Sequence, residues 1–599
     1  MKPSISDPSI ARRLDRRAFL SLGFSLAACA GCSTLLTRAQ SPDEEAELKE
    51  KKLDTVGDNT SPWGLRPVKL ESVGLVVNLP NTGSDPPPSS QRQLLINEMQ
   101  SHEVANIEKL LASPKTSLAL VIGYLPPGVR KGDRLDVEVR VPPGSETTSL
   151  RGGLLMPSRL RQVEIFEGAL HTGNVDGLAG GNVLVDSLFD NNADKVLENR
   201  GRILSGAVSQ KNLDLGLMIR KENASIFLST LIGRAINGRF HTYDKGSKVG
   251  VATPRRDNYI TLTIPQNYRH NILHYVRVVR AIPLRETPLE RATRLPILEK
   301  QLLEPISAAR AATQLEAIGK EAVIVLKRGA ESSNPEVKFY AAEALAYLDE
   351  TAAAKPLGET ALNESAFRWH ALTALTAMDQ VAALETLNGL LHAKSVEARY
   401  GAFFAIRTRT PSDPTTKGEI LGDKDSFQFH YHAIASTGEP VIHISRHKRP
   451  ELVVFGHEQK FNLQDALVAG DDQWVIKPDG GQIKICRFSP NKEDRIEQCA
   501  ATVDAFVRAL VRAGGGYGDV IQILSKAQKA GALEGRVVAD AMPEPGRTYY
   551  RDMEESSEAA PPDSPDATPP QQTAQRGPSA EAPPSPAEKS GEKTPGAGG

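Results

Sequence analysis

The sequence predicts an α+β fold in which mixed short-strand domains are interrupted by an all-α solenoid, with a disordered tether before the folded body and a disordered tail after it. Three observations lead to this prediction. Leu135, Val137 and Val139 alternate with charged residues, the period-two pattern of a half-buried strand. Alanines and leucines recur about every thirty residues in the second half of the chain. The stretch from 40 to about 68 and the last 50 or so residues are polar and poor in apolar side chains.

Length and charge limit the classes of function. The chain has 599 residues, which suggests roughly three or four domains. Its 72 Lys and Arg balance 73 Asp and Glu, a net charge of -1. Neither a global basic field nor a basic run with interleaved aromatics is present, so we expect no nucleic-acid partner.

The N-terminus predicts export. Residues 1–29 have the features of a signal peptide: Arg16-Arg17 forms a twin-arginine pattern, and the apolar run after it is too short to span a membrane. Residues 26–29 resemble a lipobox, which makes Cys29 the predicted lipidation site, and the following Ala30 favours the outer membrane. The expected location is the periplasm or outer membrane, with a lipid anchor. The alternative is an ordinary signal peptide with a chance cysteine.

Residues 30–69 are charged and rich in turn formers, and we expect a flexible tether there. Residues 70–285 then alternate short apolar runs with glycine and proline, as in an α+β domain. The predicted strands are 73–77, 118–122, 135–141, 162–166, 182–186, 201–207 and 259–265, and the predicted helices are 91–111 and 225–237. The charged face of Asp136, Glu138 and Arg140 is a candidate subunit contact, against the simpler interpretation of a solvated strand face.

Residues 300–412 contain an internal repeat. The recurring positions are Leu315, Leu345, Leu375 and Ile406, with Ala311, Ala341, Ala371 and Ala402 at a constant offset. Each repeat continues into a second apolar segment, so the region resembles a HEAT-like solenoid of helix pairs. Lys338, Arg368 and Arg399 recur near each helix start, where we expect an exposed, solvated edge rather than a functional site.

Residues 425–542 return to an α+β pattern. The predicted strands are 427–433, 441–444, 452–455 and 480–488, and the predicted helices are 496–513 and 520–533, the second with Asp519 as N-cap. Residues 543–599 are rich in Pro, Ser, Glu and Ala, which predicts a disordered tail. Cys486 and Cys499 either pair as a disulfide in an oxidising compartment or remain two buried thiols, and both alternatives stay open.

Two sequence features that could form a binding site, a group of histidines and a glycine run, are better explained as ordinary structural residues. His430, His432, His443, His447 and His457 lack the ligand spacing of a zinc site, so strand and surface histidines are the favoured interpretation. The glycine run 514–518 lacks the Lys-Ser/Thr of a phosphate loop and predicts a turn between helices. Since no nucleophile and base are placed together, we expect neither enzymatic activity nor a cofactor.

Residues 117–156 and their flanks resemble the flagellar basal-body P-ring protein family. The matching motif positions are Pro126, Pro127, Gly132, Asp136, Val137, Leu150, Arg151, Gly152 and Gly153, with Asp519 and Gly531 in a closing helix. Residues 73–85 and 201–207 are similar to further segments of the family. The resemblance covers about 70–285 and 425–540, and the helical repeats form an insertion between the two parts.

The resemblance implies a non-enzymatic subunit of a homo-oligomeric ring around the motor rod. Its implied partners are the rod, the outer-membrane ring and the peptidoglycan layer. Three features depart from the family pattern: the lipidated twin-arginine signal, the helical insertion and the tail. The alternative is an envelope lipoprotein that uses its helical repeats to bind a protein and has no role in motility.

Overall fold

The structure is a computed structural model that describes residues 53–166, 169–189, 195–422, 427–456, 458–470, 474–488 and 493–551. The described residues up to Arg547 form one compact unit, and the described residues from Thr548 belong to a second unit. The predicted signal peptide, the predicted lipidation site Cys29 and most of the predicted tail lie outside the described residues. Within the described residues, no helix has both the length and the apolar character needed to cross a bilayer.

The folded body begins earlier than the sequence suggested. Residues 53–69, predicted as part of the tether, contain α3 (Val56–Asn59) and β1 (Thr60–Trp63). Val56 is fully buried, and its amide donates to the carbonyl of Ile282 at 2.9 Å. The tether prediction is therefore wrong for these residues, because a few inward-facing side chains outweigh the polar local composition.

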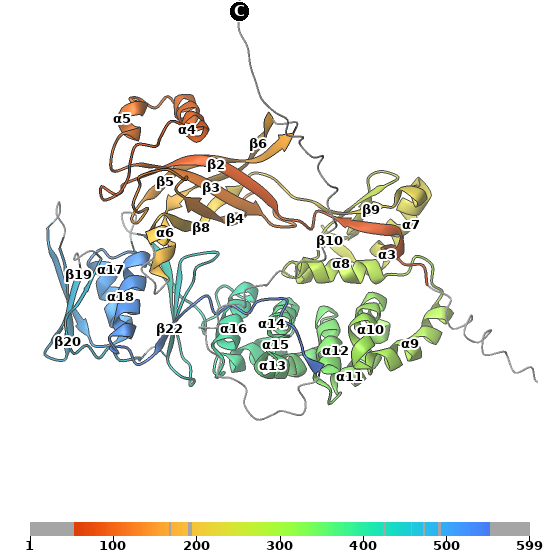
Figure 1. The fold of residues 1–599 in the computed structure, drawn as a ribbon. Coiled ribbons are helices and arrows are strands. Elements are labelled where there is room, and N and C mark those ends of the chain that lie inside the picture. Colours follow the sequence, from red (N-terminus) through yellow and green to blue (C-terminus); the bar gives the residue numbers. More distant parts are fainter. Residues whose placement is uncertain are drawn as a thin grey trace, which may run out of the picture. The chain divides into compact units, whose positions relative to one another are not determined.

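β1 is the edge of an antiparallel sheet with the order β1-β9-β13-β12. Figure 1 labels β9 of this sheet, beside α3, α7 and α8. Its other strands are β9 (Leu215–Ile219), β12 (Ala252–Pro254) and β13 (Tyr259–Leu262), and the neighbouring elements are α7 (Ile226–Arg239), the hairpin β10 (His241–Asp244) and β11 (Ser247–Gly250), and α8 (Ile272–Ala281). The predicted strand 259–265 and helix 225–237 are confirmed in this region.

A second sheet closes on itself. Its order is β4-β3-β2-β5-β6-β8-β7, and β4 also pairs with β8. The strands are β2 (Val68–Val77), β3 (Ser117–Leu125), β4 (Arg134–Arg140), β5 (Leu154–Phe166), β6 (Ala169–Asn182), β7 (Leu184–Val185) and β8 (Arg200–Ser209). Leu135, Val137 and Val139 are buried inside, whereas Glu138 and Arg140 are exposed, as the period-two pattern predicted.

The predicted helix 91–111 is divided into α4 (Ser90–Ser101) and α5 (Ile107–Leu111). Glu103 and Asn106 have φ values of 56° each, and this left-handed backbone cannot continue a right-handed helix. Leu95 and Met99 of α4 pack with Leu75 and Leu118 on the outside of the closed sheet. The two helices therefore cover an apolar patch of that sheet.

Helices fill the region after the first two sheets. They are α9 (Pro288–Leu302), α10 (Pro305–Ile318), α11 (Val323–Ala330), α12 (Pro335–Tyr347), α13 (Ala354–Asn363), α14 (Arg368–Ala377), α15 (Val381–Leu390) and α16 (Val396–Arg409). The repeated alanine and leucine positions are all buried: Ala311, Ala341, Ala371, Ala402, Leu315, Leu345, Leu375 and Ile406. The same position of each repeat is therefore buried in the packed helices.

The expected exposed edge of the repeats is wrong at two of its three positions. Arg368 is 4% exposed and Arg399 is fully buried. Arg368 donates to the carbonyls of Ala361 at 2.8 Å and Leu362 at 3.3 Å, in the last turn of α13. These orphan helix-end carbonyls need donors, and the arginine supplies them.

The last part of the compact unit contains two sheets and two helices. One sheet has the order β14-β15-β17-β16-β22 and the other β18-β19-β20-β21. The elements are β14 (Glu419–Leu421), β15 (Phe429–Ile434), β16 (Val441–Ile444), β17 (Glu451–Phe455), β18 (Leu467–Ala469), β19 (Trp474–Asp479), β20 (Gln482–Arg487), β21 (Arg495–Ala500), α17 (Val503–Arg512), α18 (Tyr517–Lys529) and β22 (Arg536–Ala539).

Two helix predictions here need correction. The first part of the predicted helix 496–513 is strand β21, which pairs along its length with β20. The second helix begins at Tyr517, so Asp519 lies at its third position and not at the N-cap. From there the Asp519 carboxylate accepts the Gly516 amide at 2.9 Å and the Trp474 indole at 3.2 Å. Residues 513–516 form the predicted turn between helices.

Cys486 and Cys499 are free, buried thiols. In the register of β20 and β21, Cys499 is opposite Ile483 and Cys486 is opposite Ile496. Paired residues share a face and side chains alternate along a strand, so the two thiols point to opposite faces of the sheet. Of the two alternatives left open by the sequence, the structure shows the buried thiols.

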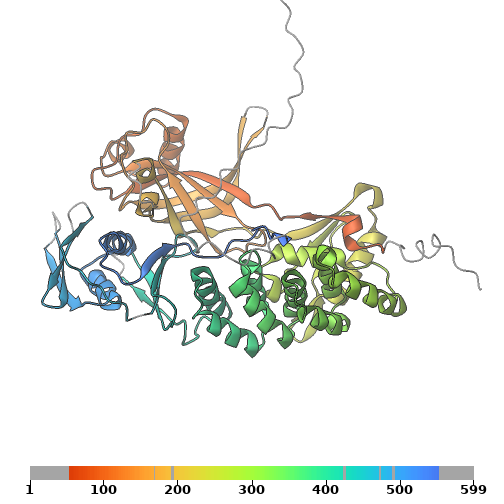
Figure 2. The ribbon, with the colours of Figure 1, turned by 60° about the horizontal axis from the view of Figure 1, so that its bottom comes forward.

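The segment after β22 continues as extended chain along the helices (Figure 2). Pro543 is buried against Gly401 of α16, and the Ala541 amide donates to Nε2 of His443 at 3.0 Å. Arg547 pairs with Glu397 at the start of α16, at 2.5 Å. The predicted disordered tail therefore begins too early, because residues 543–547 are held by a proline contact and an ion pair.

Candidate interaction site

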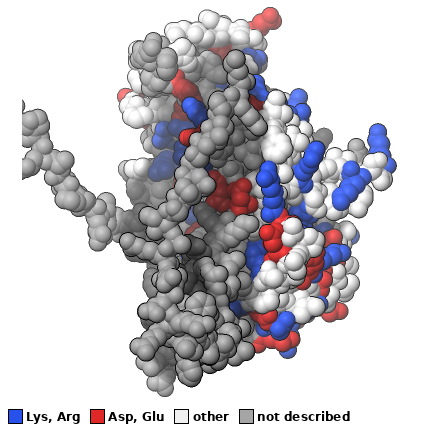
Figure 3. Space-filling view, turned by 90° about the vertical axis from the view of Figure 1, so that its right-hand side faces the viewer, with Lys and Arg blue, Asp and Glu red and all other residues white. Residues whose placement is uncertain are grey.

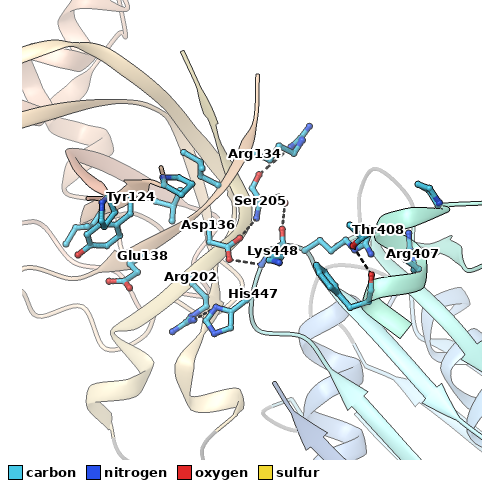
Figure 4. A pocket seen from close by; sticks show the side chains of 18 residues that line it. Tyr124, Arg134, Asp136, Glu138, Arg202, Ser205, Arg407, Thr408, His447 and Lys448 are labelled. Atoms are coloured by element: carbon cyan, nitrogen blue, oxygen red, sulfur yellow. Dashed lines mark hydrogen bonds between the residues drawn. The ribbon is translucent and has the colours of Figure 1, made fainter. Parts of the chain in front are cut away.

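A cavity of about 770 Å³ lies where the closed sheet, α16 and the turn between β16 and β17 meet (Figure 4). The closed sheet contributes strands β3, β4 and β8, while the turn contributes residues 447–449. This volume is in the range of ligand sites in proteins. The cavity therefore combines stretches of chain that are distant in sequence.

Asp136 joins two walls of this cavity. One carboxylate oxygen, Oδ1, accepts the Ser205 amide at 2.8 Å, and the other, Oδ2, accepts the Lys448 amide at 2.6 Å. Ser205 has a φ of 52° and its hydroxyl donates to the carbonyl of Lys448. The Asp136 clamp, defined as Asp136, Ser205 and Lys448, holds the β16–β17 turn against the closed sheet through charge-assisted hydrogen bonds.

A second polar cluster lies next to the cavity, where two of its lining arginines contact the buried Glu451. Arg407 and Arg449 both contact Oε2 of its carboxylate, at 3.2 and 2.8 Å, and His432 lies 3.5 Å from the same oxygen. Burial alone would raise the pKa of Glu451, but the hydrogen bond from His432 and the charges of both arginines lower it to about 2. The single carboxylate of Glu451 therefore forms ion pairs with two guanidinium groups.

The cavity lining carries an excess of positive charge. Its cationic side chains are Arg134, Arg202, Arg407, Lys448 and Arg449, with His447 beside them, and its carboxylates are Asp136 and Glu138. In the part of the chain that the structure describes, Arg134 and Lys448 have no carboxylate within ion-pair distance. The Lys448 ammonium instead lies 4.1 Å from the centre of the Phe404 ring. Burial lowers the pKa of Lys448, and Asp136 partly opposes this.

The motif positions predicted from the sequence do not form one site. Pro126, Asp136 and Val137 line the cavity, but the other motif residues shape the backbone elsewhere. Gly132, Gly152 and Gly531 have φ values of 95°, 72° and 68°, which favour glycine. Leu150 is fully buried, Gly153 leaves no room for a side chain beside Val76, and Pro127 and Arg151 lie in turns beside β3 and β5.

The histidines that were considered as metal ligands have different environments and different partners. His432 and His443 are buried, and burial lowers the pKa of His443 to about 4. His447 lies 3.2 Å from Asp540 and contacts Arg202, while His457 lies outside the described residues. Over the described ranges, no group of three or more ligand-type side chains is arranged to hold a metal ion.

Sequence reasoning missed the cations of this cavity. Arg134 and Arg202 lie inside motif stretches whose glycine and aspartate positions carry the resemblance, and Arg407 is one charged residue among many on a helix. The local run Arg446-His447-Lys448-Arg449 was the available signal. On the coloured part of the face seen in Figure 3, basic and acidic side chains are interspersed.

Comparison with known proteins identifies one matching family. The family model described as "Flagellar P-ring protein" matches residues 56–294. The flagellar P-ring protein of Thermotoga maritima is 26% identical over 228 residues, which are 37% of this chain and 63% of the relative. That of Helicobacter pylori strain G27 is 23% identical over 236 residues, 39% of this chain and 62% of the relative. The corresponding values for Pseudothermotoga lettingae are 26% over 248 residues, 40% and 68%.

The match has clear limits along the chain. The chain spans less than two thirds of the length of the first two relatives. The family-model match begins at α3 and ends within α9, so it contains the sheet β1-β9-β13-β12 and the closed sheet. The resemblance over residues 425–540, including Asp519 and Gly531, lies outside the matched range and stays a prediction.

Proposed function

We propose, from the premise that residues 56–294 belong to the flagellar P-ring protein family, that this chain is a structural subunit of a P-ring-like ring in the flagellar basal body. The observation that carries the proposal is the match itself, which covers two complete sheets and their helices. The alternative of a protein-binding module without a role in motility gains no support from these relatives. We propose no catalytic role.

In this proposal, copies of the chain form a closed homo-oligomeric ring around the motor rod. Ring closure needs head-to-tail contacts, each of about 1,600 Å² to be stable. The rod, the outer-membrane ring and the peptidoglycan layer are the proposed partners, and the proposed location is the periplasm with a lipid anchor at Cys29. We further propose that residues 300–412 are HEAT-like repeats added to this ring subunit. The helix pair α10 and α11 packs against the next pair, α12 and α13, because α12 contacts both α10 and α11.

Gene deletion and imaging test the proposal together. Cells that produce this chain should lose swimming when its gene is deleted and regain it with the full-length chain. An affinity-tagged chain should co-purify with isolated basal bodies, and electron microscopy should place the tag on a ring. A deletion strain that swims normally, or basal bodies that lack the tagged chain, would contradict the structural role.

A chain lacking residues 302–410 provides the matched comparison with the alternative. If the repeats are an addition to a ring subunit, the full chain and not the repeats alone should locate to basal bodies. If the deletion leaves ring assembly and swimming intact but abolishes capture of one defined protein, the binding-module function is favoured instead.

A further inference from the structure

We infer that the cavity beside the Asp136 clamp is a binding site for an acidic peptide segment of a partner protein. This goes beyond the proposed structural function, which assigns no ligand to the cavity. The inference depends on the distribution of charge, on the spacing of the cations and on the apolar lining.

The charge balance favours an anionic ligand. Arg407 and Arg449 share the single carboxylate of Glu451, so their combined charge is not neutralised by it. Asp136 uses both oxygens on backbone amides, and Lys448 and Arg134 have no carboxylate partner among the described residues. The Arg134 guanidinium donates to the carbonyl of Ser205 at 3.4 Å. Carboxylates of a ligand would supply the missing counter-charges in a partly desolvated site.

The spacing of the cations favours an extended ligand. In Figure 4, Arg134 lies on one side of the Asp136 clamp and Arg407 on the other, with Lys448 between them. A chain that carries several carboxylates in a row can meet all three, and a peptide of a few residues has a suitable volume for a cavity of about 770 Å³.

The apolar lining favours a peptide over a polysaccharide or an inorganic polyanion. Tyr124, Pro126, Phe404 and Pro411 line the same cavity as the cations. The side chain of Tyr124 is 46% exposed, so a ligand can reach its ring. Aromatic and proline surfaces of this kind accept an apolar side chain, and acidic residues on either side of that side chain would meet the arginines.

Fluorescence anisotropy with the full-length chain tests the inference. The probe is a fluorescein-labelled peptide in which glutamates flank a central phenylalanine, and the reference is the same peptide with glutamine in place of each glutamate. The glutamate peptide should bind at low ionic strength, and its affinity should fall as salt is added. The double variant Arg134→Gln with Lys448→Gln should bind about tenfold or more weakly, because two charge-assisted contacts are lost.

The matched control is Lys109→Gln with Lys477→Gln, which removes the same charge from exposed positions that do not line the cavity. Its affinity should equal that of the unmodified chain. An equal loss in the control, equal binding of the glutamine peptide, or full displacement of the probe by inorganic phosphate at the same concentration as the unlabelled peptide would overturn the inference. Should the double variant not fold, the exposed single variant Arg134→Gln carries the same test.

Discussion

A buried ion pair at His274 connects the matched region to the helices that follow it. Nε2 of His274 lies 2.8 Å from Oε2 of Glu316, and the Tyr268 hydroxyl donates to Oε1 of the same carboxylate at 2.6 Å. The Tyr347 ring stacks on the imidazole with 4.4 Å between ring centres. Glu343 lies 3.9 Å from Nδ1 of the histidine. The pair thus joins α8 to α10 and α12.

This pair predicts a stability that falls at alkaline pH. Burial alone would lower the pKa of His274, but Glu316 and Glu343 raise it to about 9. A histidine whose pKa is higher in the folded state contributes its stabilisation in full below about pH 6.5, and loses it as the pH rises towards 9. The raised pKa of Glu343, caused first by burial, acts in the same direction.

Thermal unfolding of the full chain between pH 6 and 9, followed by circular dichroism, measures this effect. His274→Gln should be destabilised by an amount on the order of 3 kcal/mol at pH 6, and the difference from the unmodified chain should shrink towards pH 9. His102→Gln, at the exposed C-cap of α4, is the control and should leave the pH profile unchanged. A constant difference at every pH would contradict the assignment.

The arginines of the repeat predict a second effect at the residue scale. Arg368 is buried and donates to two carbonyls of α13 and to Glu397, whereas Lys338 at the equivalent position is half-buried and reaches Glu359 at 3.4 Å. Arg368→Met should lower the free energy of unfolding by about 3 kcal/mol, because buried carbonyls lose their donors. Lys338→Met should cost less than about 1 kcal/mol. Urea unfolding compares the two, and equal losses would refute the capping role.

Sequence analysis found the repeated positions but not their environments. The spacing of Ala311, Ala341, Ala371 and Ala402 predicted the packed face of each helix, because that face depends on local periodicity. The burial of Arg368 depends on how the next helix pair stacks, which the local pattern does not contain. A charged side chain at a helix start is half-buried in one repeat and fully buried in another for this reason.

At the scale of elements, the extended segment after β22 depends on few contacts. Met542 and Pro543 lie beside α14 and α16, and Arg547 pairs with Glu397. The same carboxylate also accepts from Arg368 at 2.8 Å, and hydrogen bonds from Arg547 and Arg368 keep the pKa of Glu397 low although burial opposes this. The segment is therefore tied to the start of α16 by a shared carboxylate.

Reversing the charge of Arg547 should release this segment. In the variant Arg547→Glu, repulsion from Glu397 replaces an ion pair, so residues 541–547 should exchange amide hydrogens about tenfold faster while the helices keep their protection. Hydrogen exchange with mass spectrometry reads both regions. Lys109→Glu makes the same charge change on α5 and should leave the segment unaffected; unchanged exchange in Arg547→Glu would contradict the tie.

Elements were predictable where one short pattern determines them. The strand at β4 and the helix α7 follow from periodicity within a few residues. The strand β21 was predicted as helix because its sequence is compatible with both, and its pairing with β20 decides the outcome. The tether prediction failed at residues 53–69 for a related reason, since β1 is stabilised by pairing with β9.

At the scale of the whole compact unit, the decisive contacts join residues far apart in sequence. The closed sheet needs the pairing of β4 with β8, and the cavity needs Lys448 to meet Asp136 across 312 positions. Neither can be obtained from local patterns, so the sequence predicted the strand of Asp136 but neither its hydrogen-bond partners nor the cavity. The family match covers residues 56–294, so it bears on the first two sheets and not on the helices and sheets that follow them.

The Asp136 clamp predicts coupled unfolding of the closed sheet and the C-terminal sheets. Asp136 accepts two backbone amides, one from each side, so Asp136→Ala leaves both donors without their carboxylate. We expect the free energy of unfolding to fall by about 2 to 4 kcal/mol and the calorimetric transition to separate into two, because the two parts lose a shared contact.

The control Glu138→Ala removes the same charge from an exposed position on the same strand and should keep one transition. Asp136→Asn should lie between them, since the amide retains one acceptor oxygen but not the charge. If Asp136→Ala and Glu138→Ala behave alike, the turn at residues 447–449 is held by the arginines around Glu451 and not by the clamp.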